Sequence, residues 1–400
     1  TKEEAMKFQQ IAGKSSYIGR EGIEFYPQEL MVFHLSNLPG TATCTALDNM
    51  QNKKSKYKVP QRTVLLETSM LRPMVKGKDV TPFHVECGEY IVPFPYDKSN
   101  PKVPMSMNEL ITKAPRLAEY YQNNKKMIDE QTNYNERIIG RSDAEFYALA
   151  RVGNYSYAEN YVVFRDNSKW SAAVISNVET SWGGIKNPVF QNHAVSICED
   201  TDGNFISYDE AHFICGVINT PIVAKYMLTS SDSRSFPIRP RIYIPKYNSE
   251  NKLHKYIVEL SKKAHKDYNN VKIIQELLNE LNKTYMKILD ETLAKKINGD
   301  TNLYIENLKL LDFFLKDYII RIPIVNGYTY TSKNINEIMK TLNTIKPLKV
   351  EIFKIHNLAK KKYDTLQREI FKDEEISDEQ MQEIKIKIEN MKIKCDIIKI

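Results

Sequence analysis

The sequence predicts an α+β protein, with a mixed β-rich part followed by a C-terminal helical bundle. Short apolar runs of strand length fill residues 1–248, and apolar residues recur at helical spacing through most of 249–400. Of the 400 residues, 42% are hydrophobic and 27% are charged, a balance that can bury a core. The length favours two or three domains, and the change in pattern predicts two, 1–248 and 249–400.

Strands and helices alternate in the first domain. Segments rich in β-branched and aromatic residues, bounded by turn-forming residues, predict strands at Tyr90–Phe94, Tyr161–Arg165, Ala172–Ser176, Ala194–Cys198 and Arg241–Pro245. Helical spacing predicts helices over Met107–Met127 and Asp209–Met227. Pro115 and Pro221 are expected to interrupt them, and Ser207 stands where an N-cap belongs.

The second domain is expected to be almost entirely helical. Four blocks have apolar residues at helical spacing, namely 253–297, 303–318, 350–371 and 378–397. Only Ile320–Tyr330 looks extended. We expect the Leu and Ile stripes to form the core of a bundle rather than a partner-binding face.

Composition excludes several classes of protein. No run of 18 apolar residues occurs, and the first thirty residues lack the layout of a signal peptide, so neither a membrane span nor secretion by that route is expected. The five cysteines form no Cys-x-x-Cys pair. We therefore expect no disulfide framework or structural zinc site, and a cytoplasmic location.

Positive charge is concentrated in one stretch. Residues 53–78 contain eight Lys and Arg against one Glu, whereas the whole chain has a net charge of +7. Such a stretch is typical of a surface that binds a polyanion. A solvated lysine-rich loop explains the charge equally well.

Motifs for catalysis, cofactors and metals are absent from the sequence. There is no glycine-rich nucleotide loop, no His-Glu-x-x-His pair and no Gly-x-Ser-x-Gly elbow. His193 and His212 are isolated, which is more typical of structural histidines than of metal ligands. Glu351 and Lys354 lie on an expected helix and not at a strand end. We therefore expect no catalytic residue, metal ion or cofactor in this chain.

Six stretches between residues 19 and 247 follow one another in a familiar order. They are 19–25 (GREGIEF), 71–80 (LRPMVKGKDV), 146–164 (FYALARVGNYSYAENYVVF), Asn192-His193, 211–221 (AHFICGVINTP) and 239–247 (RPRIYIPKY). This series resembles the C-terminal target-recognition region of γ-class (TaqI-like) N6-adenine DNA methyltransferases of type II restriction–modification systems, or of fused restriction–methylation enzymes. The resemblance does not explain the helical tract beyond about residue 300.

The resemblance implies that DNA recognition and catalysis belong to different domains. The catalytic half of that family carries a glycine-rich loop for S-adenosylmethionine and an Asn-Pro-Pro-Tyr motif that holds the target adenine. Neither occurs here, and the nearest string is Phe94-Pro95-Tyr96. The chain is therefore expected to be the DNA-recognition half, as an excised domain or a separate subunit. S-adenosylmethionine and the methyltransferase or nuclease chemistry would then belong to an N-terminal or separately encoded domain, and whether this chain is itself an enzyme stays open.

Recognition of double-stranded DNA needs cations at phosphates and side chains that reach base edges. Two polar loops, 14–21 and 230–236, offer such side chains beside the basic stretch. The expected DNA-contacting residues are Lys14, Ser16 and Arg20, then Lys53, Lys54, Lys56, Lys58, Arg62, Lys76 and Lys78, and finally Ser233 and Arg234. Trp170 and Trp182 are expected to be core residues.

Two other functions remain open at this point. The chain could be a nuclease whose carboxylates are scattered in sequence, which metal-dependent cleavage by the chain alone would favour. It could also be an adaptor in a phage-defence complex, which dimerisation through the C-terminal helices without DNA affinity would favour.

Overall fold

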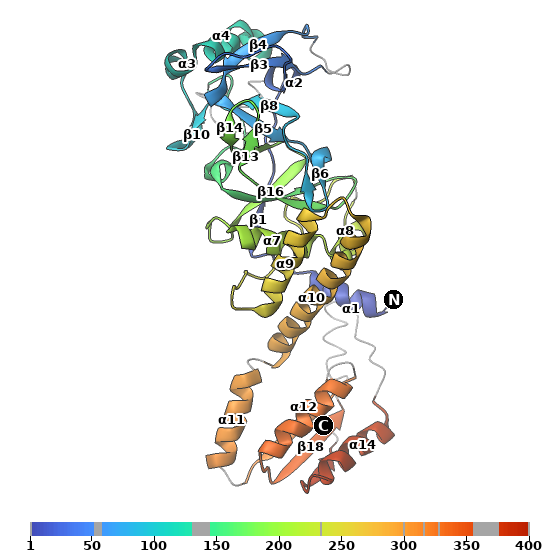
Figure 1. The fold of residues 1–400 in the computed structure, drawn as a ribbon. Helices are drawn as coiled ribbons and strands as arrows, with labels where there is room; N and C mark the ends of the chain where they lie inside the picture. The colour runs from blue at the N-terminus through green and yellow to red at the C-terminus, as the bar shows by residue number, and fades with distance from the viewer. Residues whose placement is uncertain are drawn as a thin grey trace. The chain divides into compact units, whose positions relative to one another are not determined.

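The structure is a computed structural model that describes residues 2–51, 58–129, 145–232, 234–298, 301–314, 317–326, 329–354 and 376–398. It confirms the α+β class, because helices accompany several separate sheets. The chain forms two compact units, Thr1–Glu291 and Thr292–Ile400, and Figure 1 shows the elements of each.

The boundary between the units lies after residue 291, not after 248 as the sequence suggested. The reason is that α9 (Lys252–Lys266) and the first part of α10 (Val271–Asn298) share a hydrophobic core with α7 (Tyr208–Ile218). Gly216 of α7 permits the close crossing with α9, since a Cβ there would lie 2.6 Å from Ile257 Cγ2.

A four-stranded antiparallel sheet forms the centre of the first unit. In order, it consists of β1 (Tyr17–Arg20), β16 (Ala194–Asp200), β11 (Asn160–Arg165) and β12 (Ala172–Ser176). Alternate residues of a strand face opposite sides of a sheet. Val162 and Phe164 accordingly lie in the core with α7 and α9, whereas Tyr161 and Val163 lie in a second core on the other face. Both faces of this sheet are therefore buried.

A six-stranded sheet packs beside it in the same unit. Its order is β15 (Val189–Phe190), β5 (Leu71–Val75), β8 (Tyr90–Pro93), β2 (Phe33–Leu35), β3 (Cys44–Asn49) and β4 (Thr63–Glu67). The helices α3 (Met107–Lys113), α4 (Pro115–Asn123) and α5 (Lys125–Asp129) share its core. Pro115 begins α4 as expected, and the Glu67 carboxylate accepts hydrogen bonds from Arg116 N (2.8 Å) and Leu117 N (3.0 Å) at that helix start.

The remaining elements of the first unit are short. They are α1 (Lys2–Ile11), α2 (Gln28–Met31), α8 (Pro221–Ser230), the 3₁₀ helices η1 (Thr68–Met70), η2 (Gly77–Asp79) and η3 (Asn154–Tyr157), and the strands β6 (Val80–Thr81), β7 (His84–Val85), β9 (Tyr96–Asp97), β10 (Asn100–Pro104), β13 (Val178–Thr180) and β14 (Gly184–Lys186). The expected break at Pro221 separates α7 from α8, and Ser207 caps α7 through Glu210 N at 3.2 Å.

Among the described helices, none is long and apolar enough to cross a membrane by itself. The bent pair of α7 and α8 meets the length and composition criteria only when the two are joined. Nine of the residues of α7 are buried inside the protein.

The second unit is not a helical bundle. It contains a parallel sheet of β17 (Ile319–Ile324), β18 (Lys349–Lys354) and β19 (Cys395–Ile397), together with α11 (Thr301–Phe314), α12 (Ser332–Thr344) and α14 (Asp378–Glu389). The expected helices over 350–371 and 378–397 were wrong at 350–354 and 395–397. The reason is that Val350 and Ile352 alternate with polar neighbours and point into one core, as a strand requires. Residues 355–371 lie outside the described part of the chain.

The buried His212 and the half-buried His265 lie where α7 and α9 meet the four-stranded sheet. His265 Nε2 accepts a hydrogen bond from Val174 N (2.9 Å), and its Nδ1 lies 2.7 Å from Ser261 O. His212 Nδ1 lies 3.1 Å from Ser261 Oγ. Burial lowers the pKa of His265 to about 4 and that of His212 to about 3. Both rings are therefore neutral in the folded protein at pH 7.

We predict that acid destabilises the first unit through these histidines. Their pKa in the unfolded chain is about 6.5, so the unfolded state binds protons first as the pH falls. The contribution of the neutral histidines to the free energy of unfolding is fully present above pH 6.5 and is lost as the pH falls toward 4. For His265 this loss is about 2–3 kcal/mol. Urea unfolding at pH 7.5 and 4.5 measures this loss. His265→Gln should reduce the difference between the two pH values, and an unchanged difference would contradict the assignment.

Candidate nucleic-acid interface

The segment 14–21, expected to be a loop, contains strand β1 at Tyr17–Arg20 and lies beside the segment 237–247, which follows loop 230–236. Ser16 N donates to Ile244 O (2.8 Å), and Tyr243 N donates to Ile11 O (2.8 Å). Arg239 Nε donates to Gly19 O over a longer 3.4 Å. Ser15 and Ile244 form an isolated parallel bridge, whereas further along Gly19 lies against Ile238, so the two segments share no continuous parallel register. Parts of the chain that are more than 200 residues apart thus meet along β1.

The segment 237–247 is not the strand expected at Arg241–Pro245. Beyond the bridge at Ile244 it has no strand pairing among the described residues. Pro237, Pro240 and Pro245 have no N–H to donate, which limits the ladder that this segment can form. We call residues 237–246 the proline wall.

Gly19 permits the proline wall to approach β1. A Cβ on Gly19 would lie 2.0 Å from Ile238 O, a distance that no side chain tolerates. The strand is also irregular here, with a register shift between Ile18 and Gly19. A glycine at this position is therefore a steric requirement of the contact.

A groove follows the line where β1 and the proline wall meet. One end has a volume of about 510 Å³ and is lined by Arg20, Arg151, Tyr155, Pro237, Ile238 and Arg239, among others. The adjoining end has a volume of about 370 Å³ and is mainly apolar, with Ile18, Ile197, Ile218 and Ile238 in its lining and Lys14, Arg239 and Arg241 among its polar residues. Gly19, Ile238 and Arg239 belong to both ends. We call the whole depression the arginine groove.

Two of the arginines in the groove are held by carboxylates. Arg20 Nη2 lies 2.6 Å from the buried Glu199 Oε2, and its guanidinium stands 4.7 Å from the centre of the Tyr155 ring. Arg151 Nη2 lies 3.0 Å from Glu21 Oε1, and its Nη1 donates to Gly22 O. These contacts fix both guanidinium groups at one end of the groove.

Three further cations at the groove have no carboxylate partner. Lys14, Arg239 and Arg241 are exposed, and within the described part of the chain none of them forms an ion pair. The arginine groove therefore carries an excess of positive charge that is accessible from solvent. This excess is the electrostatic signature of an anion-binding surface.

Most of the other expected DNA-contacting residues lie elsewhere or make local contacts. Arg62 Nη2 donates to Asn124 Oδ1 (2.7 Å), Lys76 Nζ stands 3.7 Å from the centre of the Tyr90 ring, and Lys78 Nζ pairs with Glu89 Oε2 (3.1 Å). Burial lowers the pKa of Lys76. Lys58 is exposed and Ser16 is half-buried on segment 14–21. Lys53, Lys54, Lys56 and Ser233 lie outside the described residues.

Arg234 lies next to the groove but does not line it. Its side chain is 88% exposed. Its guanidinium donates two hydrogen bonds to the Asp232 carboxylate, from Nη2 to Oδ2 (2.7 Å) and from Nε to Oδ1 (3.1 Å). The loop returns to the core at Phe236, whose N donates to Asp166 O. Arg234 is therefore presented on a short loop with both ends anchored.

The tryptophans are not surface platforms. Trp170 is 8% exposed and its Nε1 donates to Ile218 O at 3.0 Å. Trp182 is partly buried against the core of the six-stranded sheet. The interpretation as a core residue is confirmed for Trp170, whereas Trp182 lies at the edge of the core.

Sequence reasoning did not find Arg151, Arg239 and Arg241 as site residues. The pair of arginines flanking Pro240 was a usable signal, because cations two residues apart on an extended segment project to the same side. Arg151 carried no such signal. Its φ of 62° is unusual for a residue with a side chain, and only the fold brings it to segment 14–21.

The isolated histidine and the carboxylate singled out in the sequence make local ion pairs. His193 Nδ1 pairs with Asp166 Oδ1 at 3.2 Å. Glu351 lies on β18, not on the helix expected, and is held by Arg321 and Lys349, each at 2.7 Å. Within the described ranges, no group of three or more His, Cys, Asp or Glu side chains is arranged to hold a metal ion.

Comparison with known proteins adds no relative, since no protein-family model matches the chain and no curated protein matches its sequence.

We predict that Gly19→Ala destabilises the first unit by about 1–3 kcal/mol, as overpacking typically does. The new methyl group would press against the backbone of Ile238, which cannot turn away as a flexible side chain can. Urea unfolding of the variant measures the loss. Lys14→Ala, in the same segment but exposed, should change stability by no more than about 0.5 kcal/mol. Equal stability of Gly19→Ala and the parent would mean that the proline wall does not pack on β1.

Proposed function

We propose that this chain is a sequence-specific recognition module for double-stranded DNA, with the arginine groove as its contact surface. The observation that carries the proposal is the set of three unpaired cations, Lys14, Arg239 and Arg241, along an open groove. Phosphates supply the matching negative charge, and the release of their counterions drives association.

The spacing of the cations favours a nucleic-acid strand over a compact anion. Arg239 and Arg241 are two residues apart on an extended segment, so their Cα atoms are separated by about 7 Å. A linear polyanion can satisfy both at once and extend toward Lys14. A single small anion would neutralise only one or two of them.

The resemblance to the target-recognition region of adenine methyltransferases supports the same proposal from the sequence side. In that arrangement methyl transfer and S-adenosylmethionine belong to a catalytic domain outside these residues, and the chain contributes recognition. The protein would then act in restriction–modification and phage defence. DNA cleavage by the purified chain would instead support the nuclease alternative.

The test is binding of a fluorescent random duplex, followed by anisotropy at several salt concentrations. A logarithmic plot of affinity against salt should fall with a slope of about −0.9 for each phosphate neutralised. Selection from a random duplex library then shows whether one sequence is preferred. Absence of binding at low salt, or binding that is indifferent to salt, would refute the proposal.

We predict that Arg239→Ala and Arg241→Ala each weaken binding to all duplexes alike and reduce the steepness of the salt dependence by about one unit, because each removes one phosphate contact. The matched control is Lys283→Ala on α10, which removes the same charge from an exposed side chain paired with Glu280. If the control has the same effect as the arginine variants, the net charge and not the groove determines affinity.

We predict a different effect for Arg234→Ala. A guanidinium that leaves Asp232 can donate two hydrogen bonds to O6 and N7 of a guanine, a contact that contributes about 1–3 kcal/mol of discrimination. Specificity should therefore fall at one base position while stability changes by about 0.5 kcal/mol or less. Affinities for the selected site and its single-base variants measure this. An equal loss for all sequences would make Arg234 a phosphate contact instead.

A further inference from the structure

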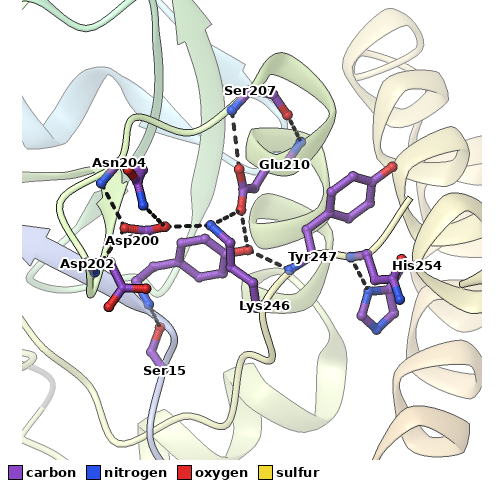
Figure 2. A network of polar contacts seen from close by, with 11 residues as sticks. Ser15, Asp200, Asp202, Asn204, Ser207, Glu210, Lys246, Tyr247 and His254 are labelled. Atoms are coloured by element: carbon purple, nitrogen blue, oxygen red, sulfur yellow. Dashed lines mark hydrogen bonds and ion pairs between the residues drawn. The ribbon is translucent and has the colours of Figure 1, made fainter. Parts of the chain in front are cut away.

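A lysine lies between two buried carboxylates at the end of the proline wall (Figure 2). Lys246 Nζ is 2.7 Å from Asp200 Oδ2 and 2.9 Å from Glu210 Oε1. Asp200 is 2% exposed and Glu210 is 7% exposed. The Tyr17 hydroxyl donates to Glu210 Oε1 and accepts from Tyr247 N, both at 2.8 Å. We call these residues the Lys246 cluster.

The cluster joins three elements that are far apart in sequence. Asp200 ends β16, Glu210 belongs to the first turn of α7, and Tyr17 begins β1. Figure 2 shows the lysine side chain reaching across to both carboxylates from the chain segment that precedes Tyr247. One ammonium group therefore links the proline wall to the sheet and to α7.

The loop that holds Asp200 is organised around this carboxylate. Asp202 N (2.9 Å) and Asn204 N (2.8 Å) donate to Asp200 Oδ1, and Asn204 Nδ2 (3.1 Å) donates to Oδ2. Although burial opposes ionisation, Lys246 and these donors hold the pKa of Asp200 well below its usual range. The carboxylate is thus charged at neutral pH and requires a cation.

The proline wall has few other attachments to the N-terminal segment. Tyr243 N donates to Ile11 O of α1, Ile244 O accepts from Ser16 N, and Arg239 Nε donates to Gly19 O over 3.4 Å. The stretch that carries Arg239 and Arg241 lies between these backbone bonds and the anchor at Phe236. The position of both arginines therefore depends on how the end of the wall is held.

We infer that Lys246 is a positioning residue for the arginine groove. Its ammonium group neutralises Asp200 and Glu210 and thereby fixes the end of the proline wall against β16 and α7. It also prevents two carboxylates from repelling an anion that approaches the groove. The part of this inference that concerns DNA rests on the proposed function, whereas the part that concerns the wall does not.

The test compares Lys246→Met with the parent in three measurements. Hydrogen exchange of the Tyr243 amide in the free protein should become about tenfold faster, because local opening of the wall requires less free energy. Affinity for duplex DNA should fall about tenfold, while the slope of its salt dependence stays the same. A slope reduced by about 0.9 would show that Lys246 binds a phosphate directly, and unchanged exchange would show that it does not hold the wall.

Two further variants keep the inference falsifiable. Lys246→Met/Asp200→Asn/Glu210→Gln removes both of the buried charges that the single variant leaves uncompensated, so it should fold even if Lys246→Met does not. Its exchange should remain fast, because the link to the wall is still missing; exchange at the parent rate would overturn the inference. Lys283→Met serves as the control for loss of one charge. If the parent itself fails to bind DNA, the proposed function fails, and the exchange measurement still decides the positioning role.

Discussion

The contact between β1 and the proline wall is the constraint on which the rest of the first unit depends. It places segment 14–21 beside Arg239 and Arg241, and it closes one side of the core that contains Ile242 and Ile244. Gly19 makes the contact sterically feasible, and the backbone bonds of Ser16 and Tyr243 give it direction. Without this contact the arginines would lie on separate loops, and no groove would exist.

The four-stranded sheet connects β1 to the helices and strands of the rest of the first unit. Because both of its faces are buried, β16 and β11 contact α7 and α9 on one side and β5 and β15 on the other. Arg20 is held by Glu199 of β16, so the sheet fixes this end of the groove. Rigid support of this kind is what recognition by side chains requires.

Local patterns predicted much of the fold. The strands at 161–165 and 172–176, the cap at Ser207 and the breaks at Pro115 and Pro221 follow from propensity and turn chemistry, which act over a few residues. The same reasoning was wrong for Arg241–Pro245, where the described residues form a single bridge at Ile244, and at 350–354, where Val350 and Ile352 alternate as a strand of a parallel sheet. For the candidate site, the two loops could be proposed from composition. The role of Arg151 and of the Lys246 cluster could not, because it arises from contacts between segments more than 40 residues apart.

The long sequence separations in the groove have a consequence for the order of folding. The Tyr17 hydroxyl and the amide of Tyr247 are 230 residues apart, and β1 pairs only with β16. A contact between residues so far apart in sequence closes a large loop. The chain loses conformational entropy when that loop closes, and this cost must be overcome before the contact contributes any stability. During synthesis, β1 therefore has no strand partner until β16 has left the ribosome, and the groove is completed only when residue 247 follows. Recognition of an anion by this groove is thus a property of the nearly complete first unit, acquired at the end of its assembly.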